Sequence, residues 1–344
     1  MRSHLLIATL LSLSLLPPAL ALHAQEAPSP SGPPPASNAP PVPQNDVDAP
    51  TLNVNVNLVN IYFSAPDKEG FITNLAKSDC QLTEDKTPQT IKNFTQEKSL
   101  PLTIGILLDT SGSQMNVLPL EQQSGATFLR NVLTPKDEAF LISFDINVDL
   151  LSDYTNRASE IQRALNRAQI NTGAGTGSVT GNGTPRGTLL FDAVSLAANE
   201  KLRQEAGRKI LVLLTDGGDQ GSTETLKSAT EAAQKANAII YVILIADHEF
   251  YGGGFNLADS GGRDMEQLAK ETGGRVINVG NNGKKLEDAF QQIQDELRTQ
   301  YLASYTPTNG KAAGTFRKID LACGKNLKIQ TRKGYYAISS TDQQ

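Results

Sequence analysis

The chain has 344 residues, and its formal net charge is −5 at pH 7. Its lysines and arginines are scattered along the sequence rather than gathered in a basic stripe, which argues against nucleic-acid binding. Only two cysteines and three histidines are present, so the sequence lacks the ligands of a typical zinc site.

Residues 1–24 have the features of an export signal. Arg2 precedes an apolar run over 5–16, and small residues follow as far as Ala24, which is the pattern of a signal peptide. The run is too short to span a membrane comfortably, and no later segment approaches the required length. The proline-rich residues 25–50 predict an extended, disordered linker. We therefore expect an exported protein of the periplasm, cell surface or medium, with no membrane span in the mature chain.

Apolar strands and amphipathic helices alternate through the middle of the chain. Because the strands are continuously apolar and rich in β-branched residues, they predict an α/β fold with a doubly wound, mostly parallel, Rossmann-like sheet. A hairpin adds an antiparallel edge strand at 147–151. The other expected strands are 102–108, 138–144, 209–215, 238–245 and 275–279, and the expected helices are 119–133, 156–168, 189–203, 223–236, 264–271 and 283–298.

The two flanks of this α/β region contain short strands that cannot bury a face alone. We expect residues 51–100 and 299–338 to form one small β-sandwich, with the domain at 101–298 inserted into it and a tail at 339–344. The first expected strand of the flanks covers 52–58 and resumes through Ile61 and Phe63 after a β-bulge near Leu58–Val59. The other expected strands are 78–83, 90–95, 300–305, 315–322 and 326–332. Each flank carries one cysteine, Cys80 and Cys323, and these form either a disulfide bond or two buried thiols.

The stretch Asp109-Thr110-Ser111-Gly112-Ser113 directly follows the first strand of the α/β region. It lies where the strand ends, and ligands of open α/β sheets bind at that edge. One carboxylate with neutral hydroxyls, and without His or Cys, suits a hard cation such as Mg²⁺. The motif therefore predicts a cation site.

Two further pieces accompany this motif: Thr188, just before an apolar helix, and Asp216, just after the strand 209–215. With these pieces in this order, residues 102–298 resemble a von Willebrand factor type A (VWFA) domain. The flanks, with their Leu82-Thr83-Glu84-Asp85 turn, are similar to exported proteins related to this domain that are common in acidobacteria.

The resemblance implies a metal-ion-dependent adhesion site (MIDAS). Ser111, Ser113 and Thr188 would supply hydroxyl ligands, and Asp109 and Asp216 would bind directly or through water. Thr184 is the alternative to Thr188. The cofactor would be Mg²⁺, with Mn²⁺ or Ca²⁺ as alternatives, and the partner would be a protein that presents an Asp or Glu side chain to the metal. Taken singly, these residues also fit turn and helix-capping positions.

Two long loops should lie at the same edge of the sheet. Residues 171–187 are almost entirely small and polar, whereas residues 247–263 contain Phe250, Tyr251 and Phe255. These aromatic side chains either contact the partner protein or fold back onto the sheet.

We expect no catalysis. The mature chain keeps a single histidine, His248, and it contains neither a Gly-x-Ser-x-Gly elbow nor a P-loop. The favoured function is an exported, metal-dependent adhesion or protein-binding module. The alternative is a structural envelope protein with a stabilising or vestigial metal site, and an unrecognised hydrolase ranks last.

Overall fold

The computed structural model describes residues 58–68, 70–97, 100–171, 187–246, 260–309, 313–325 and 327–337. They all belong to one compact unit. The expected signal peptide, linker and C-terminal tail lie outside the described residues. Within the described part of the chain, none of the helices combines the length and the apolar character that a membrane crossing requires.

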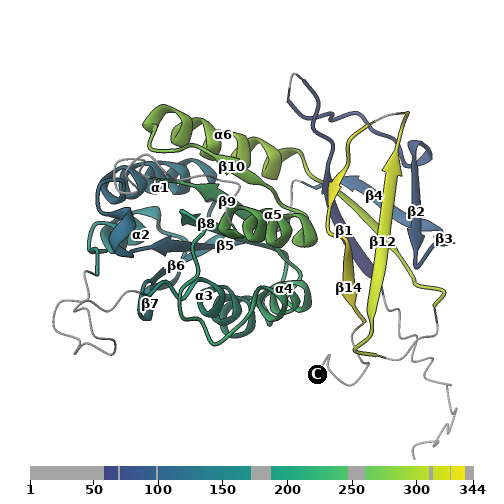
Figure 1. Cartoon of the computed structure of the whole chain (residues 1–344). Coiled ribbons are helices and arrows are strands. Elements are labelled where there is room, and N and C mark those ends of the chain that lie inside the picture. Colours follow the sequence, from purple (N-terminus) through teal and green to yellow (C-terminus); the bar gives the residue numbers. More distant parts are fainter. Residues whose placement is uncertain are drawn as a thin grey trace, which may run out of the picture. The chain divides into compact units, whose positions relative to one another are not determined.

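A six-stranded sheet with the order β10-β9-β8-β5-β6-β7 forms the centre of the α/β region (Figure 1). All neighbouring strands are parallel except β6 and β7, which pair in an antiparallel hairpin. This confirms the predicted fold class, including the antiparallel edge strand. The strands are β5 Leu102–Asp109, β6 Glu138–Phe144, β7 Val148–Thr155, β8 Arg208–Thr215, β9 Ala238–Leu244 and β10 Val276–Asn278.

Helices cover both faces of this sheet (Figure 1). One apolar core lies between the sheet and α1, α2 and α6, and a second lies between the sheet and α3, α4 and α5. Burial on both faces explains why β5 and β8 consist of buried residues throughout. The helices are α1 Leu118–Val132, α2 Ala158–Leu165, α3 Leu190–Leu196, which continues as a π-helical turn Ala197–Leu202, α4 Leu226–Lys235, α5 Ser260–Thr272 and α6 Gly283–Thr299.

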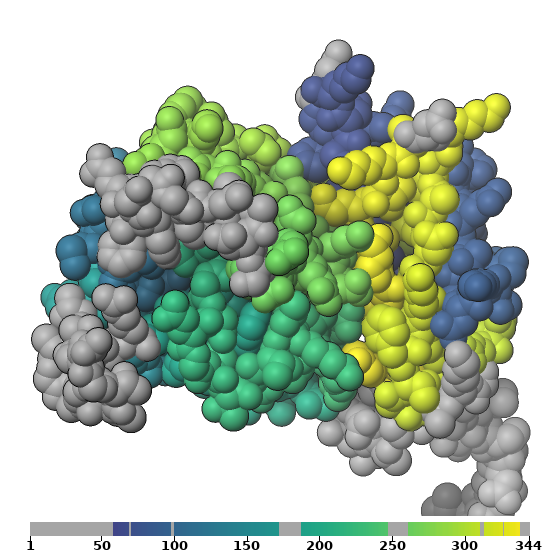
Figure 2. All heavy atoms as spheres, in the orientation of Figure 1, coloured from purple at the N-terminus to yellow at the C-terminus, as the bar shows by residue number. Residues whose placement is uncertain are grey.

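The flanks form two four-stranded antiparallel sheets, β13-β1-β11-β4 and β14-β12-β2-β3. Apolar side chains of both sheets share one core, and Figure 2 shows atoms of the blue N-terminal flank massed against those of the yellow C-terminal flank. The strands are β1 Val59–Ser64, β2 Cys80–Glu84, β3 Thr87–Gln89, β4 Ile91–Gln96, β11 Tyr301–Tyr305, β12 Phe316–Cys323, β13 Gln330–Thr331 and β14 Gly334–Tyr336.

The two cysteines sit opposite each other on β2 and β12 and are joined by a disulfide bond. Their sequence separation is 243 residues, so the bond closes a loop around the whole α/β region. This pairing holds together one strand of each flank.

The expected strand 326–332 is wrong in its bounds, because this part of the chain changes sheets. β13 pairs with β1 in one sheet, and β14 pairs with β12 in the other. Gly334 permits the second pairing, since a Cβ atom there would lie only 2.5 Å from the carbonyl oxygen of Arg317. The apolar pattern alone does not reveal this change of partner.

One buried carboxylate joins the end of α6 to its surroundings. Oε1 of Glu296 accepts hydrogen bonds from the hydroxyls of Ser64 (2.9 Å) and Tyr241 (2.8 Å) and from the side-chain amide of Gln330 (2.6 Å). Its Oε2 lies 3.0 Å from Nε of Arg275. Glu296 therefore links the last helix to strands of both the α/β region and the flanks.

Candidate metal centre

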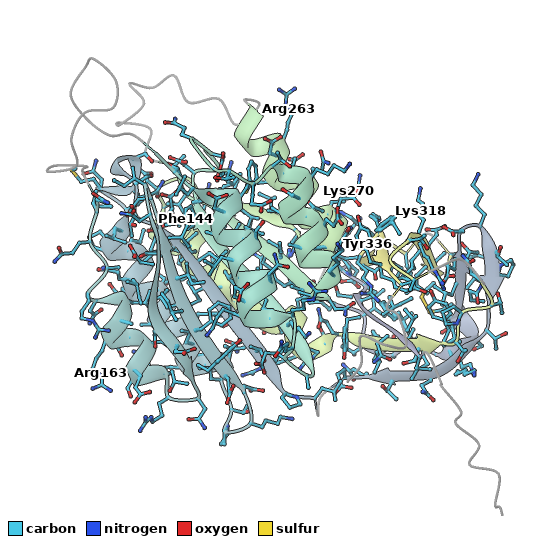
Figure 3. All side chains as sticks on the ribbon, turned by 90° about the horizontal axis from the view of Figure 1, so that it is seen from below. Phe144, Arg163, Arg263, Lys270, Lys318 and Tyr336 are labelled. Carbon is cyan, nitrogen blue, oxygen red and sulfur yellow. A yellow bond between two sulfur atoms is a disulfide. The ribbon has the colours of Figure 1, made fainter. Side chains whose placement is uncertain are left out.

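The predicted site residues converge where the order of the sheet reverses. β5 pairs with β6 on one side and with β8 on the other, so the chain winds outward in both directions from this point. Asp109 is the last residue of β5, and Asp216 directly follows β8. Phe144, the last residue of β6, marks the same edge in Figure 3 and accepts a 2.9 Å hydrogen bond from the Thr110 amide. Such a switch point is the usual ligand site of an open α/β sheet.

Asp109 is fully buried and is held by its neighbours. Its Oδ1 accepts the backbone N–H of Ser111 at 3.0 Å, and its Oδ2 accepts the hydroxyl of Thr215 at 2.6 Å. A short 3₁₀ turn, Gly112–Gln114, follows. This turn brings the hydroxyl oxygens of Ser111 and Ser113 to 3.0 Å from each other. The Asp-x-Ser-x-Ser spacing therefore gathers three oxygen-bearing side chains within one turn of chain.

Asp216 and Thr188 reach this edge from two other segments. Asp216 is nearly buried, and its Oδ1 accepts the N–H of Gly218 at 3.1 Å. Thr188 forms a two-way backbone pair with Gln220, with N–O distances of 3.0 and 2.9 Å. The loop that follows Asp216 therefore holds Thr188 in place. Thr184, the alternative ligand, lies outside the described residues.

The electrostatics at this edge favour a bound cation. Burial, followed by repulsion from Asp216, raises the pKa of the Asp109 carboxyl to about 7, despite its hydrogen bonds with Ser111 and Thr215. Two carboxylates are thus held close together away from water, and a divalent cation would offset their repulsion.

The donor set also fits Mg²⁺. Among the described residues, no three His, Cys, Asp or Glu side chains converge as a metal cluster, so the arrangement has few charged ligands. Mg²⁺ accepts one or two carboxylates and fills its remaining positions with neutral oxygens or water. Ser111 and Ser113 offer such oxygens beside Asp109. The residues present are therefore suited to holding this ion.

Sequence reasoning missed a supporting residue, Asp145, which directly follows β6. Its Oδ2 accepts the hydroxyl of Thr110 at 2.7 Å, and its Oδ1 accepts the side-chain amide of Asn171 at 3.0 Å. Its backbone carbonyl accepts the N–H of Leu189 at 2.8 Å. Asp145 therefore joins the motif to the segment that carries Thr188. The available signal was its position, since an acid at the end of a buried parallel strand also marks Asp109 and Asp216.

Asp219 has a structural task at the same edge. Its Oδ1 accepts the backbone N–H of Phe191 at 3.2 Å, near the start of α3, and the hydroxyl of Ser222 at 2.5 Å. It therefore fixes the loop after Asp216 to the helix after Thr188. The other sequence-predicted surface residues, Phe250, Tyr251 and Phe255, lie outside the described residues, as does His248.

The chain is similar to several proteins of known structure. The protein BatB from Bacteroides thetaiotaomicron is 17% identical, with a TM-score of 0.44 over 57% of this chain and 99% of that one. Proximal thread matrix protein 1 from the mussel byssus, with a zinc-occupied MIDAS motif, is 15% identical, with a TM-score of 0.47 over 62% of this chain and 50% of that one. The chain thus spans half of the mussel protein. A comparison with curated protein sequences gives no match.

The sequence itself matches the von Willebrand factor type A domain over residues 104–292. The match covers more than half of the chain. It begins within β5, continues through β10 and includes all five predicted site residues. The sheet order, the helices on both faces and the matched sequence agree, and the chain belongs to the von Willebrand factor type A domain family.

Proposed function

We propose that this protein is an exported, non-catalytic binding module that captures an acidic side chain of a partner protein through a divalent metal ion. The observation that carries the proposal is the convergence of Asp109, Ser111, Ser113 and Asp216 at one sheet edge, where the two carboxylates repel each other. Membership of a family whose domains are usually non-catalytic binding modules supports it.

The ligand set provides a reason for capturing an acid. Ser111, Ser113 and Thr188 would offer uncharged oxygens, and an aspartate that binds only through water compensates the charge of the ion less than a direct ligand does. An incoming carboxylate is then a better additional ligand than water, because it supplies the missing negative charge. We propose Mg²⁺ as the resident ion, with Mn²⁺ or Ca²⁺ as alternatives.

Export is part of the proposal. The signal-like residues 1–24 support it, and so does the Cys80–Cys323 disulfide, because such bonds persist in oxidising compartments. The similarity of the flanks to exported acidobacterial relatives is consistent with a periplasmic or surface location. This similarity of sequence does not identify the partner protein.

The first test measures metal binding directly. Protein freed of metal with EDTA is titrated with MgCl₂ and with MnCl₂ in a calorimeter, and the Asp109→Ala and Asp216→Ala variants are compared with Asp149→Ala. Asp149 is an exposed acid on β7, so its removal is a matched control. We expect binding by the wild type and the control, and none by the two site variants. Failure of the wild type to bind either ion would refute the proposal.

The second test concerns the partner. Exported proteins of the source organism are passed over the immobilised protein with Mg²⁺ or with EDTA, and capture should require both the ion and Asp109. The same variant separates the binding module from a structural envelope protein. Loss of capture with the fold retained supports a binding module, whereas unfolding of Asp109→Ala supports a structural ion.

A further inference from the structure

Another carboxylate lies buried in the α/β region, and within the described part of the chain it has no hydrogen-bond partner. Glu121, in the first turn of α1, is fully buried. Neither of its carboxylate oxygens has a hydrogen-bond partner among the described residues. Buried carboxylates are almost always paired, since leaving one unpaired costs several kcal/mol. Glu121 therefore needs an explanation that the metal-free fold does not provide.

The position of Glu121 on its helix makes it more unusual. The buried residues of α1 include Leu118, Leu129 and Val132, which belong to the apolar core between the sheet and α1, α2 and α6. Glu121 occupies the same buried stripe, where an apolar residue would normally stabilise the packing. The acid is thus kept at a position that packing alone would give to leucine or methionine.

The electrostatic surroundings connect Glu121 with the candidate metal centre. After burial, the causes that raise its pKa are repulsion from Asp109 and then repulsion from Asp216. A second unpartnered acceptor lies in the motif itself: Oε1 of the buried Gln114 has no partner among the described residues, although its Nε2 contacts Ser113 Oγ at 3.5 Å. Two buried side chains near the ligand set therefore have unused oxygen acceptors.

We propose that Glu121 is an outer carboxylate of the metal centre, which strengthens cation binding by giving up its proton when the ion binds and so adding a third negative charge to those of Asp109 and Asp216. It is not a direct ligand beside the two aspartates, because no three such side chains cluster for a metal within the described part of the chain. Glu121 would act on the ion through its charge, which is felt more strongly in the protein interior than in water, and not through a hydrogen bond to a ligand. The inference rests on the proposed metal site, and it adds a residue that the Asp-x-Ser-x-Ser motif does not include.

The decisive variant is Glu121→Gln, which keeps the shape of the side chain and removes its charge. The control is Glu200→Gln. Glu200 is exposed on the turn Ala197–Leu202, so this variant removes one negative charge from the surface instead of the interior. Binding of Mg²⁺ and of Mn²⁺ is measured by calorimetry on EDTA-treated protein, and Mn²⁺ is also followed by electron paramagnetic resonance. We expect Glu121→Gln to weaken binding roughly 10- to 100-fold, because it removes a negative charge that acts on the ion through the protein interior, and Glu200→Gln to have no effect.

A second variant, Glu121→Leu, tests whether weaker metal binding could come from a loss of the fold instead of the loss of the charge. Leucine suits the buried stripe, so the metal-free protein should melt at a higher temperature than the wild type, while the stabilisation gained from Mg²⁺ should shrink. Equal Mg²⁺ affinity of the wild type and Glu121→Gln would overturn the role of Glu121 alone. If the wild type binds neither ion, the metal site itself is refuted, and this inference with it.

Discussion

Removal of the metal should make the stability of this protein fall as the pH rises. In the metal-free fold, burial and the neighbouring Asp216 raise the pKa of Asp109 from 3.8 to about 7. Between these two values the unfolded chain has lost the Asp109 proton, whereas the folded protein still holds it. The folded state therefore binds more protons in this window, and its free energy of unfolding decreases with increasing pH.

The size of this effect follows from the shift of the Asp109 pKa. Each unit of difference between folded and unfolded pKa corresponds to about 1.4 kcal/mol, so a rise from 3.8 to about 7 gives a loss of roughly 4 kcal/mol. No loss is expected from this residue below the unfolded pKa, and the loss is complete above the folded one. A change of this size is a large part of the 5–15 kcal/mol that is typical for a folded domain.

The assay is urea unfolding in EDTA at a series of pH values from about 4 to about 7.5, with Asp109→Asn as the control. Asparagine cannot ionise, so the difference between the wild type and this variant isolates the contribution of Asp109. Mg²⁺ should flatten the decline in the wild type, because the ion favours the ionised carboxylate, and it should not affect the variant. A difference between the two proteins that does not change with pH in EDTA would refute the electrostatic reasoning.

Three further predictions concern stability. Gly105→Ala should lower the free energy of unfolding by about 1–3 kcal/mol, because a Cβ atom in the middle of β5 would lie 2.3 Å from Cζ of Phe140. Unfolding in urea measures this, and an unchanged urea midpoint would contradict the packing described for β5. Glu296→Ala should cost about 3–5 kcal/mol, since it leaves three donors and a cation without their shared acceptor, and a cost below 1 kcal/mol would argue against it. Replacing Cys80 and Cys323 by serine should destabilise by roughly 5 kcal/mol, given the 243-residue separation, and calorimetric melting of both proteins checks this.

The sheet could be predicted from the sequence because each of its inner strands is buried on both faces. β5 and β8 are runs of apolar residues, and a continuous run of this kind has few alternatives in an alternating strand–helix pattern. The flanks were harder to predict, since β13 and β14 are only two and three residues long. Strands this short have no usable periodicity, and their partners are decided by contacts such as the close approach at Gly334.

The residues of the candidate site also fall into two groups. Some could be predicted from their position at the end of a strand, and others have a role that depends on contacts with residues distant in the sequence. Asp109 and Asp216 can be predicted because each follows an apolar strand, and parallel strands bring their carboxyl ends to one edge. Asp145 follows a strand as well, but its role depends on the hydroxyl of Thr110 and the amide of Asn171, which sequence spacing does not connect with it.

Glu121 is a different case, because in the sequence it looks like an ordinary acid in the first turn of a helix, where the helix dipole favours a negative charge. Only its burial shows that it faces the protein interior rather than solvent. A helix that buries an acid on its apolar side loses stability, so its retention points to a task other than packing. The apolar positions of α1 follow the helical period, so a sequence-based prediction can assign them to the buried side of the helix. Glu121 lies on the same side but is not apolar, and it is the residue that we connect with the metal.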